Sequence, residues 1–234
     1  MHIPDGFIDA PTSLAAGAAA AGVVVVCVRR SGEVMEDKQA PMAGLVAAFI
    51  FAVQMLNFPV AAGTSGHLLG GALAAILVGP YLGTLCVSVV LVVQALLFAD
   101  GGLSALGLNV INMAIVGAFG GYAIFLLARR LLPSTRAGVV VASGIGAGLS
   151  VVLASLAFTL EYAVGGAGGA SVARVAGAMV GTHVLIGLGE ALITAMTVSA
   201  VMAVRPDLVH GARDLVAAPA AAPVPGRSAT AVGG

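Results

Sequence analysis

The first two residues, Met1 and His2, carry three nitrogen atoms that can bind one metal ion. Methionine aminopeptidase removes an initiator methionine efficiently only before a small residue, so we expect Met1 to stay ahead of His2. The amine and the His2 amide nitrogen can close a five-membered ring on a metal, and the amide and the His2 ring Nδ1 a six-membered one. This planar set suits Ni²⁺, Cu²⁺ or low-spin Co²⁺. The alternative is a solvated, frayed terminus with an incidental histidine.

A second imidazole lies in GTSGHLLGG, residues 63–71. Glycines and hydroxyls here interrupt apolar sequence, and irregular backbone at membrane depth is tolerated only where it lines a cavity or packs on protein. Broken helices of this kind often build substrate sites. His67 could therefore supply a fourth nitrogen; alternatively, Thr64, Ser65 or a backbone carbonyl simply hydrogen-bonds the ring.

Other polar groups within the apolar sequence are costly in a bilayer, so each is a functional candidate. Asn109 and Asn112 share one helix face and, like Gln94, could bind an inward-folded N-terminal segment or orient an imidazole; the alternative is hydrogen bonding between helices. His183 and Glu190 also share a face. They favour a buried hydrogen-bonded arrangement over an ion pathway or proton relay.

Composition places these groups in a membrane protein. Of 234 residues, 60% are hydrophobic and 9% are charged, whereas soluble domains carry about 25% charged residues. Continuous apolar runs predict helices rather than the alternating strands of a barrel. The zero net charge argues against a nucleic-acid partner. Cys27 and Cys86, both inside apolar runs, are expected to be buried thiols.

The fold class we expect is an all-α membrane protein with a seven-helix transmembrane bundle. The expected helices cover residues 12–28, 41–58, 67–78, 81–99, 106–127, 137–160 and about 175–204. Residues 1–11 would form an N-terminal arm, 12–206 the bundle, and 207–234 a cytoplasmic tail that is largely disordered. Pro4, Asp5 and Gly6 form a turn that lets the arm fold inward.

Basic residues orient this bundle through the positive-inside rule. If the N-terminus is outside, eight of them share the cytoplasmic side, namely Arg29, Arg30, Lys38, Arg129, Arg130, Arg136, Arg205 and Arg213. We therefore expect an outside N-terminus, a cytoplasmic C-terminus, and a multi-pass protein of the inner (plasma) membrane. No Walker A loop or HExxH motif occurs, so we expect a transport subunit without its own ATPase and without a resident cofactor.

At MHIPDGF, GTSGHLLGG and QALLFADGGLSALGLNVINMA, the chain resembles the CbiM/NikM family over residues 1 to about 206. These proteins are substrate-capturing membrane subunits of energy-coupling-factor (ECF) transporters for cobalt and nickel. The resemblance implies that Met1, His2 and His67 bind the transported Co²⁺ or Ni²⁺. It also implies a CbiQ/NikQ-like coupling subunit, CbiO/NikO-like ATP-binding subunits and a CbiN-like accessory subunit. The lack of a fused two-span extension favours cobalt slightly.

Two other functions remain open from the sequence. A secondary transporter would couple protons through Glu190, and an intramembrane metalloenzyme would use His67, His183 and Glu190.

Overall fold

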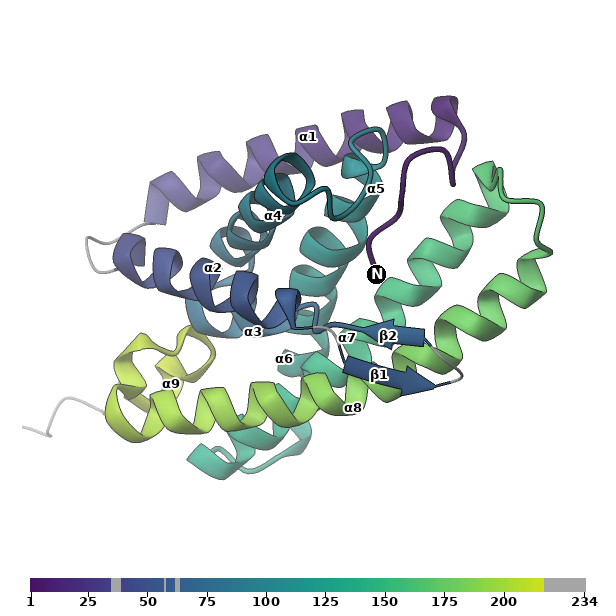
Figure 1. Ribbon diagram of the computed structural model, residues 1–234. Helices are drawn as coiled ribbons and strands as arrows, with labels where there is room; N and C mark the ends of the chain where they lie inside the picture. Colours follow the sequence, from purple (N-terminus) through teal and green to yellow (C-terminus); the bar gives the residue numbers. More distant parts are fainter. Residues whose placement is uncertain (35–38, 57, 62–63, 217–234) are drawn as a thin grey trace, which may run out of the picture.

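The computed structural model describes residues 1–34, 39–56, 58–61 and 64–216, and the described chain is a helical bundle with one small hairpin (Figure 1). The helices are α1 (Ala10–Val34), α2 (Gln39–Met55), α3 (Gly71–Val78), α4 (Pro80–Leu97), α5 (Leu106–Asn109), α6 (Gly121–Leu131), α7 (Arg136–Gly165), α8 (Val172–Val204) and α9 (Arg213–Val216). The strands are β1 (Phe58–Ala61) and β2 (Thr64–Gly66), and shorter helical turns are η2 (Pro206–Leu208) and η3 (His210–Ala212).

Five helical stretches are long and apolar enough to cross a membrane. They are Ala10–Glu33, Pro80–Leu97, Leu106–Leu131, Arg136–Gly165 and Val172–Val204. The third combines α5 and α6 with the π-helical segment η1 (Val110–Gly120) between them. The chain is therefore a helical membrane protein, with two shorter helices, α2 and α3, completing the bundle.

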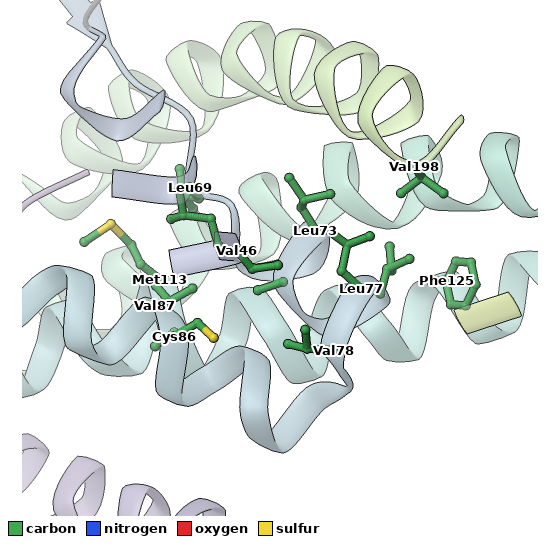
Figure 2. Close-up of a cluster of buried hydrophobic side chains, with 14 of the residues drawn as sticks. Val46, Leu69, Leu73, Leu77, Val78, Cys86, Val87, Met113, Phe125 and Val198 are labelled. Atoms are coloured by element: carbon green, nitrogen blue, oxygen red, sulfur yellow. The ribbon is translucent and has the colours of Figure 1, made fainter. Parts of the chain in front are cut away.

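The short helix α3 occupies the centre of the bundle, and all eight of its residues are buried. Its neighbours approach at backbone distance, because a Cβ on Gly71 would lie 2.7 Å from the Met113 carbonyl oxygen of η1, and one on Gly83 would lie 2.7 Å from the Ala75 nitrogen. Small residues allow this close packing of membrane helices. Apolar side chains around α3 form the main core (Figure 2).

Two expected helix boundaries were wrong for local backbone reasons. The second helix was expected to reach Phe58, but α2 ends at Met55 and Phe58 begins β1, because Pro59 restricts the preceding residue to extended conformations. The third was expected to begin at His67, but α3 begins at Gly71. Gly70 adopts the left-handed conformation (φ 77°), and residues 67–70 form an irregular connection to the helix.

The segment after α8 is also more ordered than expected. Residues 206–216, most of which we assigned to a disordered tail, form η2, η3 and α9. Val209 and Ala212 are fully buried, and the His210 ring lies against Gly79 at the end of α3. Burial of these apolar groups orders the segment; residues 217–234 lie outside the described part of the chain.

Candidate metal centre

The N-terminal arm enters the bundle and ends at its centre. In Figure 1 the purple arm leaves the start of α1 and brings the N-terminus near α7 and β2. The Ile3 amide donates to Asn109 Oδ1 at 2.8 Å, and the Gly102 amide donates to the Ile3 carbonyl at 2.8 Å. Asn109 Nδ2 also donates to that carbonyl at 3.3 Å. Asn109 and Gly102 therefore satisfy the backbone of Ile3, whose side chain is 1% exposed.

The turn predicted at residues 4–6 fastens the outer part of the arm. Asp5 Oδ1 accepts hydrogen bonds from the Ser104 amide at 2.7 Å and from its hydroxyl at 2.5 Å. Gly6 has a positive φ of 76°, which glycine adopts without strain. The Asp9 amide then donates to the Gly165 carbonyl at 2.7 Å. The arm is thus tied to the α4–α5 connection and to the end of α7.

The Met1 amine and the His67 imidazole meet inside the bundle. The amine nitrogen lies 2.7 Å from His67 Nε2, and His67 Nδ1 lies 2.8 Å from the Leu68 carbonyl oxygen. Since a carbonyl only accepts, His67 Nδ1 carries the proton and Nε2 carries the lone pair. The His2 and His67 rings stack with their centroids 4.8 Å apart. The arm therefore brings the three predicted residues together.

One distance between these nitrogens has the length expected between neighbouring ligands of a square-planar metal site. The Met1 amine, the His2 amide and the His2 imidazole would occupy three corners of a square around the metal. The fourth corner then lies next to the amine. With metal–nitrogen distances of about 2.0 Å, neighbouring nitrogens of a square lie about 2.8 Å apart. The observed 2.7 Å between the Met1 amine and His67 Nε2 has this length. Among the described residues no cluster of three or more His, Cys, Asp or Glu side chains could hold a metal, so this donor set depends on the two main-chain nitrogens.

Burial keeps these nitrogens unprotonated at neutral pH. Burial lowers the pKa of the Met1 amine to about 5, against a smaller opposing effect of Asp100. Burial, and then the positive charge of the amine, lower the pKa of His2 to about 3. The pKa of His67 is held well below its usual range by burial, with smaller contributions from the amine, His2 and His183. Lone pairs that a transition metal requires are thus available.

Asp100 is a site residue that sequence reasoning missed. Its Oδ2 lies 3.5 Å from His2 Nε2, and the His2 side chain is only 8% exposed. This carboxylate is the charged group beside the ring, and His2 Nε2 makes no hydrogen bond to any described residue. The adjacent Gly101, with φ 92°, passes so close that a Cβ would lie 3.2 Å from His2 Nδ1. An aspartate followed by two glycines is typical of a turn, and only the inward path of the arm brings His2 to Asp100.

The other two amide candidates, Gln94 and Asn112, contact residues outside the arm. Asn112 Nδ2 donates to Glu161 Oε2 at 2.7 Å and so joins η1 to α7. Gln94 is fully buried, and its Nε2 lies 3.8 Å from the Met55 sulfur. Thr64 and Ser65 belong to β2, but their side chains lie outside the described part of the structure. Of the three amides, only Asn109 binds the arm.

His183 and Glu190 have different surroundings. His183 Nδ1 donates to the Met179 carbonyl at 2.7 Å, and its Nε2 has no hydrogen-bond partner among the described residues. Glu190 accepts hydrogen bonds from the amides of Leu69 and Gly70. The Glu190 carboxylate therefore binds the backbone of the two residues that follow Leu68, and it does not pair with His183.

Gly102→Ala is expected to displace the arm. An added Cβ would lie 2.5 Å from Asp5 Oδ1 and 2.7 Å from the Pro4 carbonyl carbon. Overpacking costs about 1–3 kcal/mol, which corresponds to a loss of about 5- to 150-fold in Ni²⁺ affinity if docking of the arm is required. Isothermal titration in detergent measures this. Gly22→Ala, with open space at its Cβ, is the control; equal affinities for both variants would contradict a docked arm.

Comparison with known proteins defines the class first. A crystal structure of a truncated transition metal transporter superposes with a TM-score of 0.80 and 31% identity, covering 87% of this chain and 99% of the other. A cobalt transport protein, CbiM, of Sorangium cellulosum is 41% identical over 77% of this chain and 81% of its own length. A fused nickel transport protein, NikMN, of Rhodobacter capsulatus is 34% identical over 70% of this chain and 47% of its own length. The fold is that of a transition metal transporter.

The family follows from the sequence itself. Residues 2–208 match the CbiM family, described as the cobalt uptake substrate-specific transmembrane region. The chain belongs to this family of membrane transport components, and the resemblance noted in the sequence is confirmed.

Proposed function

We propose that this protein is the substrate-capturing component of an ATP-driven ECF importer, with Co²⁺ as the cargo ahead of Ni²⁺. The observation that supports it most is the meeting of the Met1 amine with His67 Nε2 at 2.7 Å inside the bundle. The description of the family as a cobalt uptake region supports cobalt.

In this proposal the cargo binds four nitrogens: the Met1 amine, the amide and Nδ1 of His2, and Nε2 of His67. Binding releases the proton of the His2 amide, a step that hard, oxygen-preferring ions such as Mg²⁺ and Ca²⁺ do not drive. Cu²⁺ binds such a set more tightly than Ni²⁺ or Co²⁺. Discrimination against copper therefore depends on its low availability.

The proposed orientation places the arm, residues 1–11, at the outer side of the inner membrane. Seven helical segments within residues 12–206 form the membrane bundle, and the C-terminal segment lies in the cytoplasm with most of the basic residues. The ion enters from outside, the arm closes over it, and ATP hydrolysis in partner subunits opens the site inward. We expect 217–234 to remain a disordered tail.

The proposed partners are a CbiQ/NikQ-like coupling subunit, CbiO/NikO-like ATP-binding subunits and a CbiN-like accessory subunit. The relative in Rhodobacter capsulatus is named as a fused NikMN protein, which supports an accessory subunit of the N type. Surrounding lipid is the other contact that apolar helices α1 and α8 require.

Uptake of radioactive Co²⁺ and Ni²⁺ tests the proposal. Cells that express the chain with its coupling and ATP-binding subunits are expected to accumulate the ion, and cells with a catalytically inactive ATP-binding subunit are not. A metalloenzyme would give no ATP-dependent uptake. A proton-coupled carrier would transport with the chain alone and would tolerate His2→Ala; both results would contradict the proposal.

A further inference from the structure

Glu190 provides a buried connection between α8 and the segment that carries His67. Its Oε2 accepts from the Leu69 amide at 2.8 Å, and its Oε1 accepts from the Gly70 amide at 2.7 Å. Glu190 is 2% exposed. Both carboxylate oxygens are therefore used to hold two consecutive amides that lie 121 and 120 residues away in the chain.

These two amides lie at the beginning of α3, where backbone N–H groups have no partner within the helix. A carboxylate at this end accepts those N–H groups and interacts favourably with the helix dipole. Gly70, with φ 77°, turns the chain so that its amide and that of Leu69 face one side chain. The Leu69 carbonyl is held as well, since Gln54 Nε2 donates to it at 2.6 Å.

The backbone that Glu190 holds is directly connected to His67. The carbonyl of Leu68 accepts from His67 Nδ1 at 2.8 Å, and the ring nitrogen opposite, Nε2, lies 2.7 Å from the Met1 amine. A shift of residues 68–70 would therefore change both the tautomer-setting hydrogen bond of His67 and the direction of its lone pair.

We propose that Glu190 is a positioning residue that holds His67 in place to bind the metal through the amides of Leu69 and Gly70. The proposal rests on the proposed function, because it assumes that His67 binds the cargo. It assigns Glu190 a role through hydrogen bonding, in contrast to the proton-coupling role that the sequence left open.

Glu190→Gln tests this with little change in shape. An amide has one acceptor oxygen, so its NH₂ group would face a backbone N–H and one of the two hydrogen bonds would be lost. Removal of a partner behind a metal ligand typically lowers metal affinity by roughly 10- to 100-fold. We expect a loss of this size for Ni²⁺, measured by isothermal titration of the purified full-length chain. Thr194→Val, a buried change one turn further along α8, is expected to leave the affinity unchanged.

A double-mutant cycle separates positioning from general destabilisation. In a His67→Ala background, Glu190→Gln is expected to have no further effect on Ni²⁺ affinity. Electron paramagnetic resonance with Cu²⁺ as the probe counts the bound nitrogens. The spectrum of Glu190→Gln should show a fourth nitrogen that is bound more weakly than in the unmodified chain. In His67→Ala this fourth nitrogen should be absent. If Glu190→Gln does not fold, Glu190→Asp, which keeps the charge but shortens the reach, replaces it in the cycle.

The outcomes distinguish the two proposals. If His67→Ala alone does not weaken binding, the proposed function fails. If His67→Ala weakens binding but the Glu190 change has no effect, or has the same effect in both backgrounds, the positioning role fails and the metal site stands.

Discussion

A Gly-Ser extension ahead of Met1 is expected to abolish high-affinity metal binding. The Met1 nitrogen is 2.7 Å from His67 Nε2, in a contact that is partly buried. An added residue converts the amine into an amide, which binds a metal only after it loses a proton, and it places two further residues at the end of the arm that contacts His67. We expect Ni²⁺ affinity to fall by more than about 100-fold. This loss exceeds the roughly 10- to 100-fold effect of removing a residue that only hydrogen-bonds to a metal ligand.

The measurement compares Ni²⁺ titrations of the unmodified chain and of the extended chain, with mass spectrometry to verify that the extension is present. The matched control carries the same two residues after Gly234, in the segment that we expect to be disordered. Circular dichroism of both variants checks that the bundle is intact. Wild-type affinity in a verified N-terminal extension would rule out the amine as a ligand.

His67→Ala is expected to have the second large effect. The imidazole is 5% exposed and touches both the amine and the ring of His2. Its removal leaves the chelate of Met1 and His2 without a fourth nitrogen. We expect Ni²⁺ affinity to fall by more than about 100-fold and uptake to fall to background, while the helices remain assembled.

The control for this variant is His210→Ala, because His210 is also an imidazole beside α3 but lies at its opposite end, against Gly79. Near-normal affinity in His210→Ala and a large loss in His67→Ala would locate the effect at the arm. Electron paramagnetic resonance with Cu²⁺ adds a count of bound nitrogens, expected to drop from four to three. An unchanged count in His67→Ala would exclude His67 from the site.

The sequence predicted the five long apolar helices, because the length of an apolar run can be read from the local sequence. The errors at Phe58 and His67 arose from the backbone preferences of Pro59 and Gly70, which shorten α2 and α3. Apolar residues in 206–216 looked too sparse for a core, yet Val209 and Ala212 are buried against other helices. Such burial depends on neighbours that the local sequence does not reveal.

The residues of the candidate site likewise include some that the local sequence indicates and some that it does not. Met1, His2 and His67 were candidates by residue type, and the resemblance to the CbiM/NikM family was needed to select them as one set. Asp100 and the target of Glu190 could not be predicted, because each partner belongs to a different part of the chain. An acidic residue next to two glycines was the available signal for Asp100, but the same pattern is typical of a turn.

The pairing of Ile3 with Asn109 spans 106 residues and has a consequence for biogenesis. The arm is synthesised before the residues that bind it, Gly102 and Asn109, which lie at the α4–α5 connection and in α5. The start of the chain therefore stays undocked until residues 102–109 have been synthesised. A nascent chain stalled before Asn109 would contain every proposed ligand and still be unable to hold the ion.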